Sequence, residues 1–479
     1  MKSLAKNTFF NILYEVVSLV FPLVYSMYVA RVLFAGGVGK VSFANNIVSY
    51  FILFASFGLP TYSVREIAKC HDNQNEKNTL FSELFLLNGI FTTVVLLIYT
   101  GCLCFIPFMR ENYLLYICCG IPLLLNYFNI EWLYKGNEEF GFILVRSIVI
   151  KLSMTVALLL FVHRKEDYII YALILSMATT GNYLFNVVHA RKIVKLTIKN
   201  LNLKKHIKPV CVFFAGMFMA SAYSRLDVLM LGIFGDSSAV GYYSYAQKTI
   251  NIIITICTAF SAASLPRLSY YYEHEKEKFY DLIRKGSSLL FFIAIPLTVG
   301  CILLAESIVL VLYGNSFSGS IMTVRILGIL IFIKGLGDLL CYQLVMSTGY
   351  EKIRIPAAAV ASIINAVLNF ILIPLFMQSG AAVASVISEL IVNIGQFIYV
   401  SRKLHIQLSL KAFFQSILIS AIMGMCIFST IHFFEMKPIA IFVIGTISGI
   451  IVYLVLNVLL RTDMFYFIKN KVYRLLRRT

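Results

Sequence analysis

Charged residues are scarce in this chain of 479 residues, because Asp, Glu, Lys and Arg together make up only 13% of it. A soluble protein of this length exposes far more charge, since its surface must be hydrated. Hydrophobic residues, in contrast, make up 59% of the chain. The composition therefore excludes a soluble globular domain and predicts an integral membrane protein.

Motifs of the common enzyme and metal-site classes are also missing. The ten cysteines include no paired C-x-x-C, which argues against a zinc site and against a disulfide framework. There is no phosphate-binding Gly-rich loop followed by Lys, no H-E-x-x-H and no G-x-S-x-G. We therefore expect no enzymatic activity, no bound cofactor, no metal site, and no ATP-driven transport by this chain alone.

Long apolar segments are present instead, and a membrane span needs about 20 mainly apolar residues. The segments are continuous rather than alternating, which predicts helices and not the short strands of a barrel. We place helices near residues 8–32, 41–64, 79–105, 112–133, 141–162, 168–189, 209–234, 239–265, 286–312, 320–345, 354–376, 380–401, 409–433 and 438–460. The predicted fold is an all-α integral membrane protein of about fourteen transmembrane helices.

The positive charge predicts how the chain is oriented. With the N-terminus in the cytoplasm, the external side carries few cations, namely Arg31, Lys40, Arg110, Arg164, Lys165 and Lys437. Most of the others fall on the cytoplasmic side, including a basic tail from Lys469 to Arg478, which we expect on anionic headgroups. This asymmetry predicts that both termini are cytoplasmic. It also accounts for most of the net charge of +18 without a nucleic-acid partner.

An internal repeat predicts the domain organisation. Gly39-Lys-Val-Ser-Phe-Ala-Asn opens the second span, and Gly241-Tyr-Tyr-Ser-Tyr-Ala-Gln opens the eighth. An even number of spans separates them, so the two halves are predicted to be parallel repeats. We expect two six-helix lobes around a central cavity and two appended helices. The predicted boundaries are 1–190 for the N-terminal lobe, 191–208 for a basic cytoplasmic loop, 209–405 for the C-terminal lobe and 406–479 for the last two spans with the tail.

Ionisable residues inside predicted spans are the candidate site, because they are costly in lipid and usually face a cavity or a partner. We predict that five cations line the cavity: Arg146, Lys151, Arg225, Lys248 and Lys334. Glu15, Asp227 and Asp338 are the candidates for proton coupling, and sodium coupling stays open. Lys334 and Asp338 are four residues apart and could also be a neutralising pair. Arg225 and Asp227 point to different faces of their helix, so each needs another partner or a ligand.

Polar stripes support a wet cavity. Glu389, Asn393 and Gln396 recur at helical spacing, and so do Asn182, Asn186 and His189, and Glu15, Ser18, Pro22 and Ser26. One such stripe would be interhelical hydrogen bonding. Three of them, with several prolines that can bend spans, indicate a polar interior and movement between two access states.

Several segments resemble one family. Tyr28–Ala68 resembles the N-terminal signature of Wzx-type polysaccharide repeat-unit flippases of the multidrug/oligosaccharidyl-lipid/polysaccharide exporter superfamily. Glu131-Trp-Leu-Tyr-Lys-Gly-Asn-Glu-Glu-Phe140 resembles its W-x-[FY]-x-G-x-E motif. Gly241–Lys248, Leu265-Pro-Arg and Leu312–Phe317 also resemble it. One departure is Phe34, where the family usually has Gly after A-R-x-L.

The resemblance implies a function. Such proteins move undecaprenyl-pyrophosphate-linked oligosaccharide repeat units of O-antigen or capsule across the bacterial cytoplasmic membrane. The implied partners are this substrate, membrane lipids, and a polysaccharide polymerase with its chain-length machinery. Three alternatives stay open: a multidrug exporter of the same superfamily, a lipid II flippase, and, in another class, a membrane polysaccharide polymerase or ligase.

Overall fold

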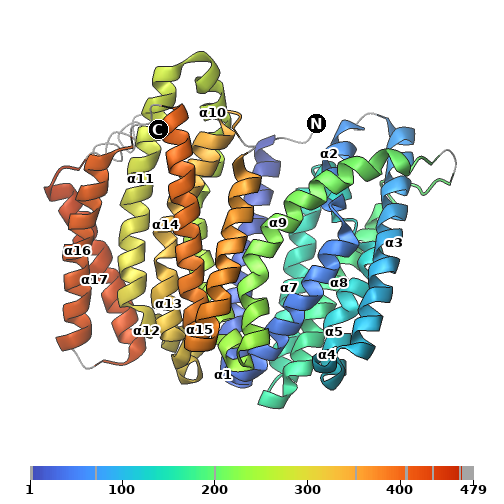
Figure 1. Ribbon diagram of the computed structural model, residues 1–479, viewed down its shortest axis with the longest axis horizontal. Helices are drawn as coiled ribbons and strands as arrows, with labels where there is room; N and C mark the ends of the chain where they lie inside the picture. The colour runs from blue at the N-terminus through green and yellow to red at the C-terminus, as the bar shows by residue number, and fades with distance from the viewer. Residues whose placement is uncertain are drawn as a thin grey trace. The chain divides into compact units, whose positions relative to one another are not determined.

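The computed structural model describes residues 4–70, 73–198, 201–350, 353–404, 408–433, 436–462 and 465. In these ranges every regular element is a helix (Figure 1). Contacts group the chain into two compact units. Unit 1 holds residues 1–232 and 236–241, and unit 2 holds residues 233–235 and 242–479. The predicted basic tail, Lys469–Arg478, lies outside the described residues.

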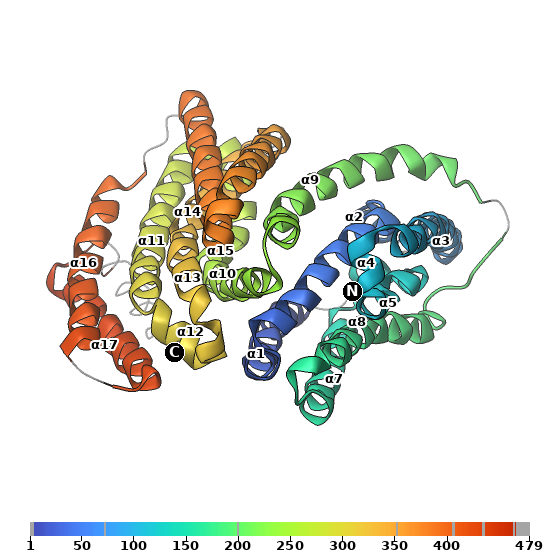
Figure 2. The ribbon, with the colours of Figure 1, turned by 60° about the horizontal axis from the view of Figure 1, so that its bottom comes forward.

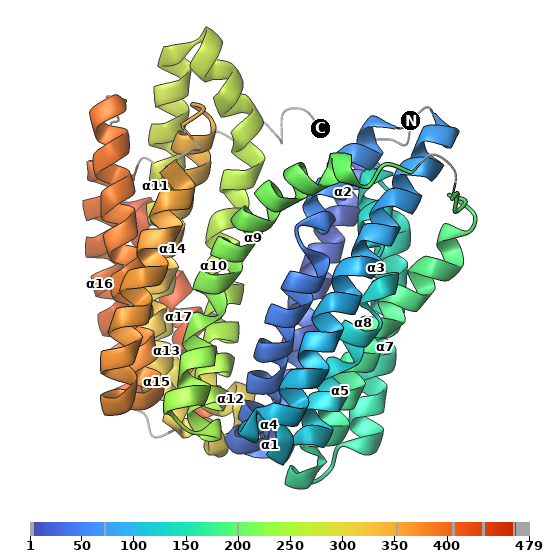
Figure 3. The same cartoon turned by 45° about the vertical axis from the view of Figure 1, so that its right-hand side comes forward.

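Unit 1 is built around the long helix α1, which packs against α3, α5 and α7 (Figure 3). Helices α7 and α8 also lie side by side (Figure 2). The elements of the unit are α1 (Leu4–Ser56), α2 (Leu59–Lys69), α3 (Gln74–Phe105), α4 (Pro107–Glu111), α5 (Tyr113–Leu124), η1 (Asn126–Phe128), α6 (Glu131–Gly136), α7 (Phe140–Phe161), η2 (Lys165–Asp167), α8 (Tyr168–Ala190), most of α9 (Lys204–Phe234) and the first residues of α10 (Ser237–His274).

Unit 2 contains the remaining helices, among which α11 packs on α16, and α16 on α17. Its elements are the rest of α10, then α11 (Lys276–Leu303), α12 (Ala305–Tyr313), η3 (Asn315–Ser320), α13 (Ile321–Gly328), α14 (Leu330–Asp338), η4 (Leu339–Met346), α15 (Arg354–Lys403), α16 (Leu410–Phe433) and α17 (Pro438–Leu459).

Many of these helices can cross a bilayer. Nine helices in the described residues are long and apolar enough to do so. A tenth span is present if Lys204–Ser221 and Tyr223–Phe234, between which the chain bends by 53°, form one bent span. The chain is therefore an all-helical, multi-pass membrane protein. The number of fourteen spans and the division into two six-helix lobes stay predictions.

Two of the apolar helices are too long for one span. Leu13–Ser56 has 44 residues and Pro356–Lys403 has 48, and at 1.5 Å per residue each is about twice the hydrocarbon thickness. Each helix is interrupted by one residue with a non-helical backbone, Phe34 (φ 55°) in α1 and Met377 (φ 49°) in α15. Each therefore consists of two helices joined at a sharp kink, and each covers two of the ranges expected as separate spans.

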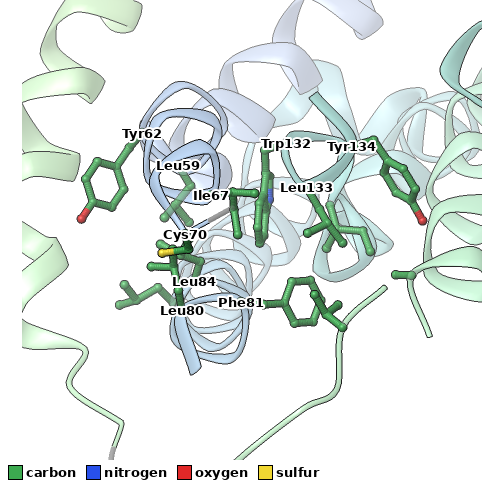
Figure 4. Packing of buried hydrophobic residues seen from close by; sticks show 14 of the residues in the cluster. Leu59, Tyr62, Ile67, Cys70, Leu80, Phe81, Leu84, Trp132, Leu133 and Tyr134 are labelled. Atoms are coloured by element: carbon green, nitrogen blue, oxygen red, sulfur yellow. The ribbon is translucent and has the colours of Figure 1, made fainter. Parts of the chain in front are cut away.

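A buried apolar cluster joins α2, α3 and α6 at one end of unit 1 (Figure 4). Ile67 of α2, Phe81 of α3 and Trp132 of α6 are all buried in it. Gly136 lets α6 approach α2 closely, because a Cβ at this position would lie 2.8 Å from Cβ of Ile67. The glycine of the W-x-[FY]-x-G-x-E motif thus has a packing role.

The two repeated glycines lie against each other's helices within unit 1. A Cβ on Gly39 would stand 1.6 Å from the carbonyl oxygen of Ser237, and a Cβ on Gly241 would stand 2.1 Å from that of Ala35. Only glycine permits so close a crossing. The two helices end differently, because α10 continues through Pro266 to His274, whereas α1 ends before Pro60.

Candidate functional site

A cavity of about 690 Å³ lies within unit 1, between α1, α2, α6, α7 and α8. Three cations line it, Lys135, Arg146 and Lys151, together with the single carboxylate of Glu131. Three positive charges and one negative charge leave the lining with a net charge of +2. The other lining residues include Tyr14, Tyr25, Trp132, Asn182 and Tyr183. The cavity therefore combines positive charge with aromatic faces and amide groups.

Arg146 is held rigidly on α7, where only 5% of it is exposed. Its Nη2 donates to Oε2 of Glu131 at 2.9 Å, and its Nη1 donates to Oδ1 of Asn186. Tyr134 fixes the same turn of α8, since its hydroxyl donates to the carbonyl of Asn186. Arg146 thus links α6, α7 and α8 and has a structural role besides its charge.

Lys135 shares the carboxylate of Glu131 with Arg146. Its Nζ lies 2.9 Å from Oε1 of Glu131, one helical turn away on α6. Burial alone lowers the pKa of Lys135, but the neighbouring carboxylate of Glu131 raises it, and the net shift is upward. Lys135 therefore stays protonated at neutral pH. Lys135 is not among the predicted site residues, because it lies outside the predicted spans, although it belongs to the W-x-[FY]-x-G-x-E motif.

Lys151 has a neutral hydrogen-bond partner. Its Nζ donates to Oγ of Ser18 at 2.9 Å and stands 5.8 Å from the centre of the Tyr14 ring. Neither group compensates its charge. Of the three cations, Lys151 is therefore the one whose charge the lining leaves most open to an anionic ligand.

The other predicted residues lie elsewhere. Glu15 is exposed on α1 and does not line the cavity, although its carboxylate is close enough to act electrostatically on Lys135 and Lys151. Arg225 and Asp227 lie on α9 of unit 1 and do not line this cavity either. Asp227 is 4% exposed, and the carbonyl of Arg225 accepts a hydrogen bond from Nδ2 of Asn46. Lys248, Lys334 and Asp338 belong to unit 2; Nζ of Lys248 stands 5.2 Å from the Tyr245 ring. The role of all these residues in binding or coupling stays a prediction.

The polar stripes are partly used in helix contacts. Asn186 and Ser18 bind cations of the cavity, whereas Asn393 donates to the carbonyl of Ile333 at 2.6 Å. Asn182 lines the cavity and also donates to the carbonyl of Ala178. The stripe at 182–189 thus contributes both to the wet interior and to the hydrogen bonds that hold it.

A buried ionic cluster was not expected from the sequence. Glu83 of α3 is 0% exposed. It accepts from Nζ of Lys205 at 2.8 Å and from the backbone N–H of Asn202 at 2.7 Å, and Nε2 of His206 lies 2.9 Å away. The other ring nitrogen of His206 lies 2.7 Å from the hydroxyl of Tyr62. The cluster attaches the start of α9 to α2 and α3.

Metal binding has no support in the described part of the chain, where no three His, Cys, Asp or Glu side chains come together.

Unit 2 has a cavity of a different kind. An open cavity of about 450 Å³ lies between α10, α11, α12, α16 and α17, and its walls are almost entirely apolar. Phe292, Leu297, Met423 and Phe442 are typical of the lining, and Thr446 and Tyr453 are its polar side chains. This cavity suits a hydrocarbon and not a charged group.

Named relatives match between 35% and 82% of this chain. A protein of Escherichia coli strain K12 named "Putative O-antigen transporter" is 23% identical over 395 residues, covering 82% of this chain and 95% of its own. "Probable flippase AglR" of Haloferax volcanii is 30% identical over 173 residues, covering 35% and 36%. A solved structure described as lipid II flippase MurJ in an inward closed conformation matches with a TM-score of 0.75 at 16% identity, covering 95% of this chain and 100% of that one.

Two family models match the sequence. The model described as MatE matches residues 213–375. The model described as "Polysaccharide biosynthesis protein" matches residues 4–272, which is more than half of the chain and includes the whole cationic cavity. The chain belongs to this polysaccharide biosynthesis protein family.

Proposed function

We propose that this chain is a flippase that moves a polyprenyl-pyrophosphate-linked oligosaccharide repeat unit across the bacterial cytoplasmic membrane. The family of the chain and the names of its relatives support transport of a polysaccharide precursor. The observation that carries the proposal is the net positive cavity inside a unit of membrane helices.

The chemistry of this cavity fits the polar part of such a substrate. A pyrophosphate needs cationic donors, and among the described residues Nζ of Lys151 bonds a neutral hydroxyl and forms no ion pair, while Arg146 and Lys135 raise the positive potential around it. Sugar rings pack their apolar faces on aromatic side chains, and Tyr14, Tyr25 and Tyr183 line the same space. The apolar cavity of unit 2 supports the proposal separately, because it can hold part of a polyprenyl chain.

We place the chain in the membrane with about fourteen spans, both termini cytoplasmic, and two lobes that alternate access. Transport needs an energy source, and Glu15, Asp227 and Asp338 are the proposed carriers of a coupling proton. Arg225, Lys248 and Lys334 are proposed as further contacts for the substrate. The polymerase and chain-length machinery are the proposed partners that use the product.

Competing functions predict other sites. The MatE match at residues 213–375 supports a multidrug exporter as one competing function. Such an exporter carries cations and should have an acidic cavity, whereas here three cations face one carboxylate. The structural likeness to the lipid II flippase concerns the fold and leaves that substrate as a second candidate. A polymerase or ligase would need catalytic residues in large external loops, which the sequence does not predict.

The test is complementation in the source organism. A strain that lacks the chain should lose surface polysaccharide and accumulate its lipid-linked precursor on the inner leaflet, and the wild-type chain should restore export. Lys151→Ala and Arg225→Ala should restore it poorly at equal protein levels. Full export by both variants would contradict the cationic-site mechanism, and a normal surface without the chain would contradict the function.

A further inference from the structure

A second cavity in unit 1, of about 420 Å³, opens at the end of the unit where α8 ends. Its walls are apolar and come from α3, η1 and α8, with Phe81, Phe85, Phe128 and Val187 among them. Arg191 and Lys195 line it as well, and both are exposed. The cavity is therefore an apolar pocket with two cations at its edge, and neither cation lines the 690 Å³ cavity.

The segment that carries these cations is fixed in place. After α8 it runs beside the first turns of α3, and three hydrogen bonds hold it there. Nε2 of Gln74 donates to the carbonyl of Ile193 at 2.8 Å, the backbone N–H of Lys195 to Oδ1 of Asn78 at 2.9 Å, and that of Thr197 to Oγ of Ser82 at 2.9 Å. One wall of the pocket is thus formed before any ligand binds.

Charge and exposure show what kind of surface the segment faces. Lys205 nearby in sequence is neutralised by Glu83, but Arg191 and Lys195 form no ion pair within the described ranges. Leu196 and Ile198 are 65% and 91% exposed, and contact of such apolar side chains with water is unfavourable. Cations beside exposed apolar side chains are typical of a segment at the level of lipid headgroups.

We propose that this pocket binds an anionic phospholipid, with part of an acyl chain against Phe81 and Phe85 and the phosphate between Arg191 and Lys195. A free phosphate would leave the apolar walls unused, and a zwitterionic phospholipid would bring no net charge to the two cations. The site is separate from the transport cavity and does not depend on what that cavity carries.

Trp132 allows a direct test, because it is the single tryptophan of the chain. Its ring centre lies 5.6 Å from that of Phe81, which lines the pocket. Bromine atoms on an acyl chain quench tryptophan fluorescence only at short range. The full-length protein is reconstituted into bilayers that contain brominated phosphatidylglycerol or brominated phosphatidylcholine, and quenching of Trp132 is compared at equal bromolipid content.

The double variant Arg191→Ala/Lys195→Ala is matched by Lys192→Ala, which removes an exposed cation of the same segment that does not line the pocket. Because Trp132 also lines the 690 Å³ cavity, Lys151→Ala serves as the control for lipid entering there.

Wild type, Lys192→Ala and Lys151→Ala should each prefer the anionic bromolipid on the order of tenfold, because Arg191 and Lys195 both contact its headgroup. The double variant lacks both contacts and should lose the preference. Equal quenching by both bromolipids in the wild-type protein would overturn the proposal. So would an unchanged preference in the double variant, or a preference abolished by Lys151→Ala.

Discussion

The two units enclose cavities of opposite character. The cavity of unit 1 holds Lys135, Arg146 and Lys151 around one carboxylate, whereas that of unit 2 has almost wholly apolar walls. Embedded charge is therefore local: the three cations of the unit 1 cavity each contact Glu131, Asn186 or Ser18, and no cation lines the cavity of unit 2 within the described residues.

This contrast separates two requirements of a lipid-linked sugar. A pyrophosphate and sugar hydroxyls need polar partners, and a polyprenyl chain needs only apolar surface. The transport proposal assigns the first task to unit 1 and lets unit 2 serve the second. Substitutions that remove charge from one cavity or add it to the other therefore test this division of tasks.

The largest effect is expected from Arg146→Ala. It removes the donor that links Glu131 to Asn186, so the free energy of unfolding in detergent should fall by about 3 kcal/mol. Arg146→Lys should lose less, because it keeps the charge. In unit 2, Arg325→Ala is the control: its side chain is 44% exposed and 4.0 Å from Glu306, so its loss should cost less than about 1 kcal/mol. Equal losses for Arg146→Ala and Arg325→Ala would refute the structural role of Arg146.

A new cation should be tolerated in one cavity and not in the other. Thr446→Lys places an ammonium among the apolar walls of unit 2 and should destabilise the protein by about 2.5 kcal/mol. Thr179→Lys places it at the exposed, polar lining of unit 1, where the cost should be much smaller. Membrane insertion and thermal unfolding measure both. If the two variants lose stability equally, the cavities do not differ as described.

The glycine crossing gives a third comparison, within unit 1. Gly39→Ala forces a methyl group against the carbonyl of Ser237 and should cost about 1–3 kcal/mol. Gly101→Ala is a matched helical change with no atom within 4 Å of the new Cβ, and it should be neutral or slightly stabilising. Thermal unfolding of the two variants decides the matter, and a harmless Gly39→Ala would contradict the close crossing.

The smallest effect concerns the two kinks, one in each unit. Phe34 and Met377 both have positive φ and are largely exposed, so replacement by glycine removes backbone strain at little loss of packing. Phe34→Gly and Met377→Gly should each stabilise the protein by about 1 kcal/mol. A drop in the unfolding temperature of either variant would show that its side chain matters more than its backbone.

Part of this picture could be predicted from the sequence. Hydrophobic length alone indicates helices in a membrane, and the rarity of charge in spans pointed to Arg146 and Lys151 before their surroundings were known. The kink at Phe34 lies where the family usually has Gly, and the positive φ explains that preference. The glycine repeat also marked a real close approach, although its partner atoms could not be read from spacing.

Other features depend on contacts between distant residues. Glu83 and His206 are 123 residues apart, and nothing in the local sequence shows that the carboxylate of Glu83 is buried against His206. Lys135 was not predicted as a site residue because it follows the predicted span 112–133, although its charge suits the site. The division of charge between the two cavities could not be predicted either, since Lys248 and Lys334 are embedded cations of unit 2 that lie outside its apolar cavity.

The most direct test of the central claim is the affinity of the purified, full-length protein for undecaprenyl pyrophosphate, measured for wild type, Lys151→Ala and Lys165→Ala. Lys151 lines the cationic cavity and forms no ion pair with the described residues, and Lys165 is an exposed lysine of the same unit, 69% accessible at its side chain. Lys151→Ala should weaken binding by about tenfold or more, which is the size of a hydrogen bond to a charged group. Lys165→Ala should bind like wild type. Equal affinities for all three proteins would contradict a cationic substrate site at Lys151.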